Sequence, residues 1–343
     1  MPSELQKTAD RFRQELLANE ARASHAMAKA YTDAYAGIDA SLQKLTRHIE
    51  TEQRAGRPIT QAWLLRQARY RDLLAQAKKE MEWFAGYAEE TILVSQRATV
   101  SLAQTFAEKL VGLQSGEDSL SGWNRLPTDA VESIVGHLQD GSPLKTLFTG
   151  LGELASAKAK ATLLTSVAAG WNPRKTASAL KEQFGGDLTR SLVVARTETL
   201  RAHREASRHS YLANSDLIES YVWMASLSGR TCAACLAMHG KEFPLSEPFG
   251  THPNCRCTMV PKLREDTNPI EESGDNWLLS QDDALQSRVL GSEAAGAAFR
   301  AGEVQLADFV RRRTSDKWGV TRSALSPNAA LTNAKGKKIP FSS

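Results

Sequence analysis

The four cysteines of the chain are the residues whose types and spacing are best suited to chemistry. All of them lie between Cys232 and Cys257, as a Cys-x-x-Cys pair and a Cys-x-Cys pair, and His252 precedes Cys255 by three residues. A Cys-x-x-Cys turn directs two sulfurs at one metal ion, and residues i and i+2 of a strand face the same side. The spacing predicts one local site with five candidate ligands, which are Cys232, Cys235, His252, Cys255 and Cys257.

Three interpretations of this cluster stay open at the level of sequence. A structural zinc site is favoured, because soft thiolate ligands at this density suit a tetrahedral Zn²⁺ ion. Two disulfides would use the same residues, although assembly in a reducing cytosol disfavours them. A redox Cys-x-x-Cys motif would need a thioredoxin-like βαβ context, which the flanking sequence does not show. Zinc or disulfides would each stabilise a small module that has little core of its own.

The composition indicates a folded protein and excludes a membrane-spanning one. The chain has 343 residues, of which 41% are hydrophobic and 24% charged, so it has enough apolar residues for a folded core. It contains no apolar run of about 18 residues, so we expect no membrane anchor, and its charged N-terminus is unlike a signal peptide. The net charge of +4 does not by itself favour nucleic acid as a partner. Phosphate-loop, HExxH, GxSxG and GxGxxG motifs are absent, so we predict no catalytic residues.

Hydrophobic spacing predicts two long helices at the N-terminus. Apolar residues recur at intervals of four and three from Tyr31 to Ile49, and again from Tyr70 to Ala88. Gly56-Arg57-Pro58 interrupts the pattern between them, which indicates an antiparallel helical hairpin. The hairpin either closes its own apolar seam or leaves part of it for a partner, as a docking arm would.

The rest of the chain predicts a predominantly α-helical α+β protein. Short helices follow a linker and end near Gly185-Gly186, and a further helix covers 188–213. Strands are expected at 218–225 and 258–261, and helical periodicity returns over 277–310. We predict four segments: a long helical hairpin (1–114), a middle region forming a central helical bundle (115–187), a helix with a small β-rich, cysteine-stapled module (188–263), and a C-terminal extension with an extended tail from Ser326 (264–343).

Charged residues on the helix at 188–213 divide between two faces. Arg196 and His203 lie in the middle of its apolar face, whereas Arg204 and its charged neighbours lie on the other. A buried arginine needs acceptors, so we expect Arg196 to bind backbone carbonyl groups of a neighbouring loop. We expect His203 to be a core histidine whose polar atoms are satisfied.

A short basic run near the C-terminus could bind DNA phosphates or form a solvated helix end. It consists of Arg311, Arg312, Arg313 and Lys317. The sequence leaves both interpretations open, because one short run carries little information.

Several separated blocks resemble the phage Mu protein F-like head morphogenesis family, which comprises minor capsid proteins of tailed bacteriophages. The resemblance covers about 151–261. The blocks are Gly170-Trp-Asn-Pro173, Ala195-Arg-Thr-Glu198, a strand ending in Trp223, Arg230-Thr-Cys-Ala-Ala-Cys235 and His252-Pro-Asn-Cys-Arg-Cys257. It implies structural anchors at Arg196, Thr197, Glu198, Trp223 and Arg230.

The resemblance also implies a non-enzymatic virion component. Such a protein would assemble in the host cytoplasm, reside in the capsid interior or at the portal vertex, and act in head assembly and genome delivery. Its expected partners are the portal protein, scaffold or major capsid protein, together with packaged double-stranded DNA. Two alternatives stay open: an ADP-ribosyltransferase or toxin-type enzyme carrying this domain, and a zinc-stabilised DNA-binding protein.

Overall fold

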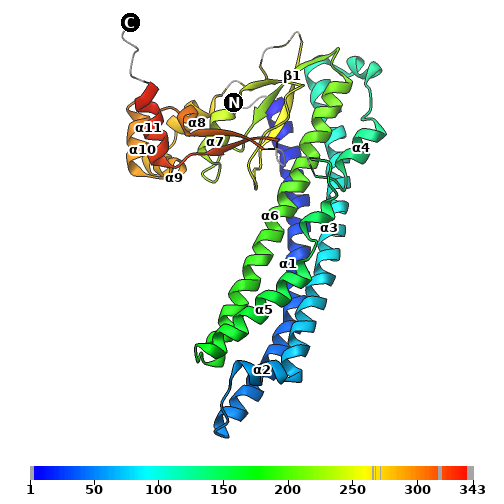
Figure 1. The fold of residues 1–343 in the computed structure, drawn as a ribbon. Coiled ribbons are helices and arrows are strands. Elements are labelled where there is room, and N and C mark those ends of the chain that lie inside the picture. Colours follow the sequence, from blue (N-terminus) through cyan, green and yellow to red (C-terminus); the bar gives the residue numbers. More distant parts are fainter. Residues whose placement is uncertain are drawn as a thin grey trace. The chain divides into compact units, whose positions relative to one another are not determined.

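The computed structural model describes residues 4–337 except 139, 265, 267, 271 and 316–318 (Figure 1). It confirms the predominantly helical α+β class. The helices are α1 (Glu4–Arg54), α2 (Gln61–Arg66), α3 (Ala68–Ser115), α4 (Thr128–Ile134), α5 (Leu151–Ala168), α6 (Pro173–Ala213), α7 (Ala233–Met238), α8 (Gly274–Leu279), α9 (Asp283–Leu290), α10 (Glu293–Arg300) and α11 (Pro327–Lys337). The strands are β1 (Ile218–Met224), β2 (Glu242–Pro244), β3 (Thr258–Leu263), β4 (Val310–Ser315) and β5 (Gly319–Ala324).

The contacts divide the chain into two compact units. Unit 1 comprises Met1–Asn19, Gln96–Ser142 and Thr199–Ser343, and unit 2 comprises Glu20–Ser95 and Pro143–Glu198. Helices α1, α3 and α6 each contribute residues to both units. The four segment limits drawn from the sequence stay a prediction. No helix among the described residues is both long and apolar enough to span a bilayer.

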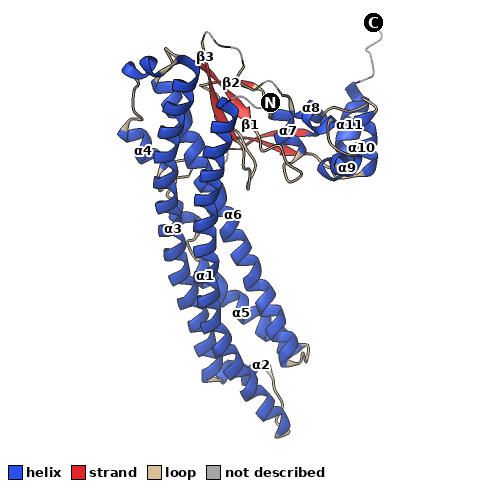
Figure 2. Cartoon of the chain, turned by 180° about the vertical axis from the view of Figure 1, so that it is seen from behind, coloured by secondary structure: helices blue, strands red, loops and turns tan. Residues whose placement is uncertain are grey.

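Unit 2 is built on the hairpin of α1 and α3, which lie side by side in Figures 1 and 2. Its seam buries Tyr31, Ile38, Met81 and Phe84, and the rings of Tyr31 and Phe84 meet edge to face with centroids 4.9 Å apart. The Tyr31 hydroxyl donates a 2.5 Å hydrogen bond to the carbonyl of Phe184 in α6. The hairpin predicted from the spacing is therefore present, with its seam packed inside this unit.

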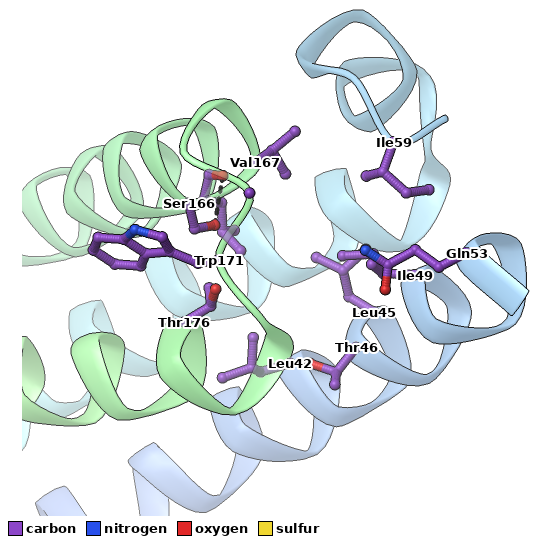
Figure 3. Close-up of a pocket in the computed structure, with 12 residues that line it drawn as sticks. Leu42, Leu45, Thr46, Ile49, Gln53, Ile59, Ser166, Val167, Trp171 and Thr176 are labelled. Atoms are coloured by element: carbon purple, nitrogen blue, oxygen red, sulfur yellow. Dashed lines mark hydrogen bonds between the residues drawn. The ribbon is translucent and has the colours of Figure 1, made fainter. Parts of the chain in front are cut away.

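A pocket lies in unit 2 near the end of α1. It is lined by Leu42, Leu45, Thr46, Ile49 and Gln53 of α1, by Ile59, by Leu163, Ser166 and Val167 of α5, and by Gly170, Trp171 and Thr176 (Figure 3). The ammonium group of Lys175 lies 4.3 Å from the ring centroid of Trp171, which lines this pocket. No candidate ligand of the cysteine cluster lines it, so the pocket is separate from the predicted site.

Unit 1 contains a three-stranded antiparallel sheet in the order β2-β1-β3. Trp223 of β1 pairs with Met259 of β3. Val222, Met224 and Val260 pack in one apolar cluster with Ala9 of α1 and Phe106 of α3. The sheet is short and would be marginal alone, so burial against these helices stabilises it.

Three expectations about secondary structure were wrong. Helix α6 continues through Gly185-Gly186, where we had expected one helix to end and another to begin at Leu188. The contacts of Phe184 with Tyr31 and of Asp187 with Lys158 hold the helix on both sides of the glycines. Such packing outweighs the low helix propensity of glycine, which amounts to about 1 kcal/mol per residue relative to alanine.

The C-terminal region holds the other two differences. Residues 327–337 form α11, although we had expected an extended tail from Ser326. Arg311, Arg312 and Arg313 of the basic run lie on β4, which pairs with β5 in an antiparallel hairpin, and are not at a helix end. Pro327 at the first position of α11 supplies a backbone angle that suits a helix start, a signal that the polar composition obscured.

Candidate metal centre

Two loops and the start of a short helix bring the predicted ligands together in unit 1. Cys232 is the N-cap of α7, and Cys235 lies in its first turn. His252 and Cys255 belong to a turn in which Asn254 adopts a left-handed conformation, with φ of 64°. Asparagine tolerates this conformation better than other residues with a side chain, so it suits the turn. Cys257 directly precedes β3.

The ligand atoms form two overlapping groups that share Cys235. The Nε2 atom of His252 lies 3.3 Å from Sγ of Cys232 and 3.2 Å from Sγ of Cys235. Sγ of Cys235 lies 3.6 Å from Sγ of Cys255. Within Cys232, Cys235 and His252, and within Cys235, Cys255 and Cys257, the ligand atoms lie within 4.8 Å of one another. All five predicted ligands thus meet in one place.

The donor set fits a metal ion. Thiolate sulfur and imidazole nitrogen are the ligands of structural zinc sites, and four of them complete a tetrahedron. All four cysteines are free, so the alternative of two disulfides is not realised in this structure. Cys235, Cys255 and Cys257 are buried, which is typical of a stabilising site and not of a reactive thiol.

The surroundings of the cluster favour the ionised form of two thiols, those of Cys232 and Cys255. The hydrogen bond with Cys235 and the contact with His252 lower the pKa of Cys232 to about 5. Burial opposes protonation of His252, but its contacts with the Cys232 and Cys255 thiols raise its pKa to about 9. Burial disfavours the Cys255 thiolate as well, yet Cys235, Cys257 and Arg204 hold the pKa of Cys255 well below its usual range. The site is thus prepared to carry negative sulfur, which a cation would neutralise.

Arg204 holds the cysteine loop against α6. Its Nε donates to the carbonyl of Cys257 at 2.9 Å, and one terminal nitrogen donates to the carbonyl of Cys255 at 2.7 Å. The other terminal nitrogen donates to Thr251 at 3.3 Å. Arg204 is only 4% exposed, so its charge is shielded from water and depends on these acceptors.

We expected Arg204 on the face opposite the apolar one, and this face is covered as well, because Arg204 is buried. We expected backbone carbonyl groups as acceptors for Arg196, and the structure places its Nε 3.0 Å from the Glu20 carboxylate. In this part of α6, Ala202, Ala206 and Ser207 are also buried. Small residues on several sides of a helix indicate that more than one face is covered, and this signal could have revealed Arg204.

The remaining predicted anchors occupy different environments. Trp223 is 1% exposed and stacks on Phe249, with ring centroids 3.9 Å apart. Glu198 is fully buried, and the Thr197 hydroxyl donates to the Val193 carbonyl one turn earlier in α6. Arg230 is exposed just before Cys232. Whether these residues act as anchors stays a prediction, although burial is consistent with that role for Trp223 and Glu198.

His203 is fully buried, as expected for a core histidine, but its hydrogen bonding differs from the expectation. Neither ring nitrogen has a hydrogen-bond partner among the described residues. Burial, and then the charge of Arg204, lower its pKa to about 3. The imidazole is therefore neutral and packs beside Phe106, with ring centroids 5.9 Å apart.

The strand that carries the basic run divides its side chains between two faces. Arg311 and Arg313 point to one side of β4 and Arg312 to the other, since side chains alternate along a strand. Arg312 and Arg313 are exposed, whereas Arg311 is partly buried. Lys317 lies outside the described residues. The two exposed arginines, Arg312 and Arg313, therefore lie on opposite faces of β4.

Comparison with known proteins places the cysteine module in a family. Residues 157–260 match the family model of Phage Mu protein F like protein, in good agreement with the resemblance at about 151–261. The chain carries a Phage Mu F-like domain. This domain includes most of α5, all of α6, strands β1 and β2, α7 and all five candidate ligands. No curated protein and no solved structure matched the chain.

The Phage Mu F-like domain relates the chain to proteins of the phage head. The family is one of head morphogenesis and is not known for enzymes. The match thus supports a head-related virion component at the level of the family.

Proposed function

We propose that the protein is a structural component of a tailed-phage head that acts with the portal or the procapsid interior during head assembly and genome delivery. The observation that carries this proposal is the Phage Mu F-like domain at residues 157–260. The buried sulfurs of Cys235, Cys255 and Cys257 support a stabilising role over a catalytic one, because a catalytic thiolate must reach its substrate.

The cysteine module would present a rigid surface in this role, and the hairpin of α1 and α3 would supply a docking arm. Co-purification tests the proposal directly. The full-length tagged chain is co-expressed with the portal protein of the same phage, and separately with its scaffold and major capsid proteins. We expect the chain to be retained on portal rings or procapsids through size-exclusion chromatography. Failure to associate with any of the three proteins would contradict the proposal.

We further propose that the module holds one Zn²⁺ ion, with Cys232, Cys235, His252 and Cys255 as ligands. The first three form one close group, and Cys255 contacts Cys235 at 3.6 Å between sulfurs. Cys257 would stay outside the tetrahedron, where its backbone N–H points at Sγ of Cys255 at 3.5 Å. Such N–H donors to ligand sulfur are a common second layer around metal sites.

Contact with packaged DNA is a separate proposal that rests on the exposed Arg312 and Arg313. A gel-shift titration at increasing salt tests it, because each phosphate contact contributes to the salt dependence. We expect Arg312→Ala with Arg313→Ala to weaken binding to double-stranded DNA and to reduce that dependence. Equal binding by the wild-type chain and the double variant would exclude this segment as a DNA contact.

A further inference from the structure

Helix α3 presents two aromatic rings and a valine to solvent within unit 2. Trp83, Tyr87 and Val94 are 51%, 38% and 55% exposed, and the two rings stack with centroids 5.6 Å apart. At about 100° per residue, the three side chains fall within about 40° of one another around the helix. They form a stripe on one side of α3, outside the seam that buries Met81 and Phe84.

Gly86 lies in the same stripe, and no close packing among the described residues requires a glycine there. A Cβ atom added there would meet nothing within 4 Å. Glycine in an exposed helix costs about 1 kcal/mol relative to alanine, and nothing in the described residues offsets that cost. A position without a side chain beside an exposed indole leaves room for a bulky group from another molecule.

The charges at the stripe are arranged symmetrically. Lys79 precedes Trp83 by four residues, and Glu90 follows Gly86 by four, so opposite charges stand at equal distances from the midpoint between Trp83 and Gly86. Both are exposed, and neither makes an ion pair among the described residues. Ala75 precedes Trp83 by eight residues and Val94 follows Gly86 by eight, so these two residues also lie at equal distances from the midpoint.

We propose that this stripe of α3, from Ala75 to Val94, is the interface of a homodimer in which two copies pack their α3 helices antiparallel. A two-fold axis at the midpoint places Trp83 over Gly86 of the partner subunit and Lys79 beside Glu90 of the partner subunit. Each contact occurs twice, as an isologous interface requires. The stripe is complementary to itself in both shape and charge, and this argues for a second copy as its occupant.

The dimer depends on two kinds of contact, which different substitutions separate. Trp83→Ala removes the group that fills the space over Gly86. Lys79→Glu and Glu90→Lys each set like charges against one another at both ends of the interface, and the combined variant restores opposite charges. Leu154→Ala and Lys160→Glu are matched controls, because both residues are exposed on α5 in the same unit.

Sedimentation equilibrium of the full chain over a concentration series tests the proposal. We expect a reversible dimer, weakened at least about tenfold by Trp83→Ala and by each single charge reversal, restored by the double reversal and unchanged in the controls. All positions are exposed, so circular dichroism should show unchanged folding. A monomer at every concentration, or a dimer that Trp83→Ala leaves intact, would overturn the interface. Charge reversals without effect, or a double reversal that fails to restore the dimer, would overturn the antiparallel register.

Discussion

Arg204 shows how one buried side chain can fix a loop that carries metal ligands. Its guanidinium donates to the carbonyl groups of both Cys255 and Cys257 from a position that water hardly reaches. Loss of the side chain leaves two carbonyl groups without these donors next to the proposed ligands. A buried acceptor that loses its partner costs about 1–3 kcal/mol, so the effect should be large.

We therefore predict that Arg204→Met lowers the free energy of unfolding by about 2–4 kcal/mol, measured by urea denaturation. Arg190→Met is the matched control, because Arg190 is exposed on the same helix, and it should change stability by less than about 0.5 kcal/mol. Arg196→Met removes the ion-pair partner of the buried Glu20 carboxylate and should also be destabilising. Equal stability of the Arg204 and Arg190 variants would contradict this account.

His203 makes stability depend on pH. Its folded-state pKa of about 3 lies below the ordinary value of 6.5, so the unfolded chain binds a proton that the folded chain excludes. Stability through this residue is complete above about pH 6.5 and is lost as pH falls towards 3, at about 2 kcal/mol between pH 7 and pH 5.

His203→Leu should remove this part of the pH dependence. We expect unchanged or greater stability at pH 7, since neither ring nitrogen has a hydrogen-bond partner among the described residues. Denaturation curves at pH 7 and pH 5 measure the difference. Burial lowers the pKa of His239 to about 4. The stability of the variant should therefore still depend on pH to some degree. A variant whose slope equals that of the wild-type chain would show that His203 is not the titrating group.

At the scale of elements, the metal centre joins the start of α7 to the turn before β3. Structural zinc stabilises such modules because the unfolded chain offers no preformed site. We predict about one Zn²⁺ per chain by elemental analysis, and a lower melting temperature after chelation. Metal-free protein with unchanged melting would contradict the zinc proposal.

The choice among five candidate ligands has its own test. Cys232→Ser and Cys255→Ser should each lose zinc, whereas Cys257→Ser should retain it. Retention in all three variants would exclude the proposed ligand set. Zinc loss from Cys257→Ser alone would place that sulfur inside the tetrahedron instead.

Sequence patterns predicted the structure best where one local feature, such as a buried face or a ligand turn, determines the spacing of the residues. The seam from Tyr31 to Ile49 faces one buried side, so its period is readable. Strand β1 is buried on both faces and was found from its β-branched and aromatic residues instead. The ligand cluster was found because cysteine spacing directly reflects turn and strand geometry. Helix α6 was misread twice, at Gly185-Gly186 and at Arg204, because packing around it overrides both helix propensity and the idea of one apolar face. The stripe at Trp83 was not recognised, although Trp83 falls outside the spacing of the seam from Tyr70 to Ala88, because an indole was not expected on an exposed face.

At the scale of the whole molecule, the N-terminal residues belong to the core of the sheet. Ala9 is fully buried and packs with Phe106, Val222 and Val260. We predict that Ala9→Asp, which puts a charge into this cluster, destabilises the protein by about 3 kcal/mol or more and lowers zinc retention during chelation. Ala21→Asp is the control, because Ala21 is exposed on the same helix. Thermal denaturation with and without chelator separates the two variants. Identical curves would refute the claim that the buried N-terminal residues stabilise the sheet and the metal centre.

Unit 1 is assembled from three stretches of chain, and the first of them ends at Asn19. During synthesis on the ribosome, that stretch emerges first, yet its partners Val222 and Val260 are translated more than two hundred residues later. Glu20–Ser95 and Pro143–Glu198, by contrast, are complete well before the C-terminus is made. The order of translation therefore lets the hairpin of α1 and α3 fold before the cysteine module has been synthesised. A nascent chain released before that point would contain the folded hairpin but not the three-stranded sheet.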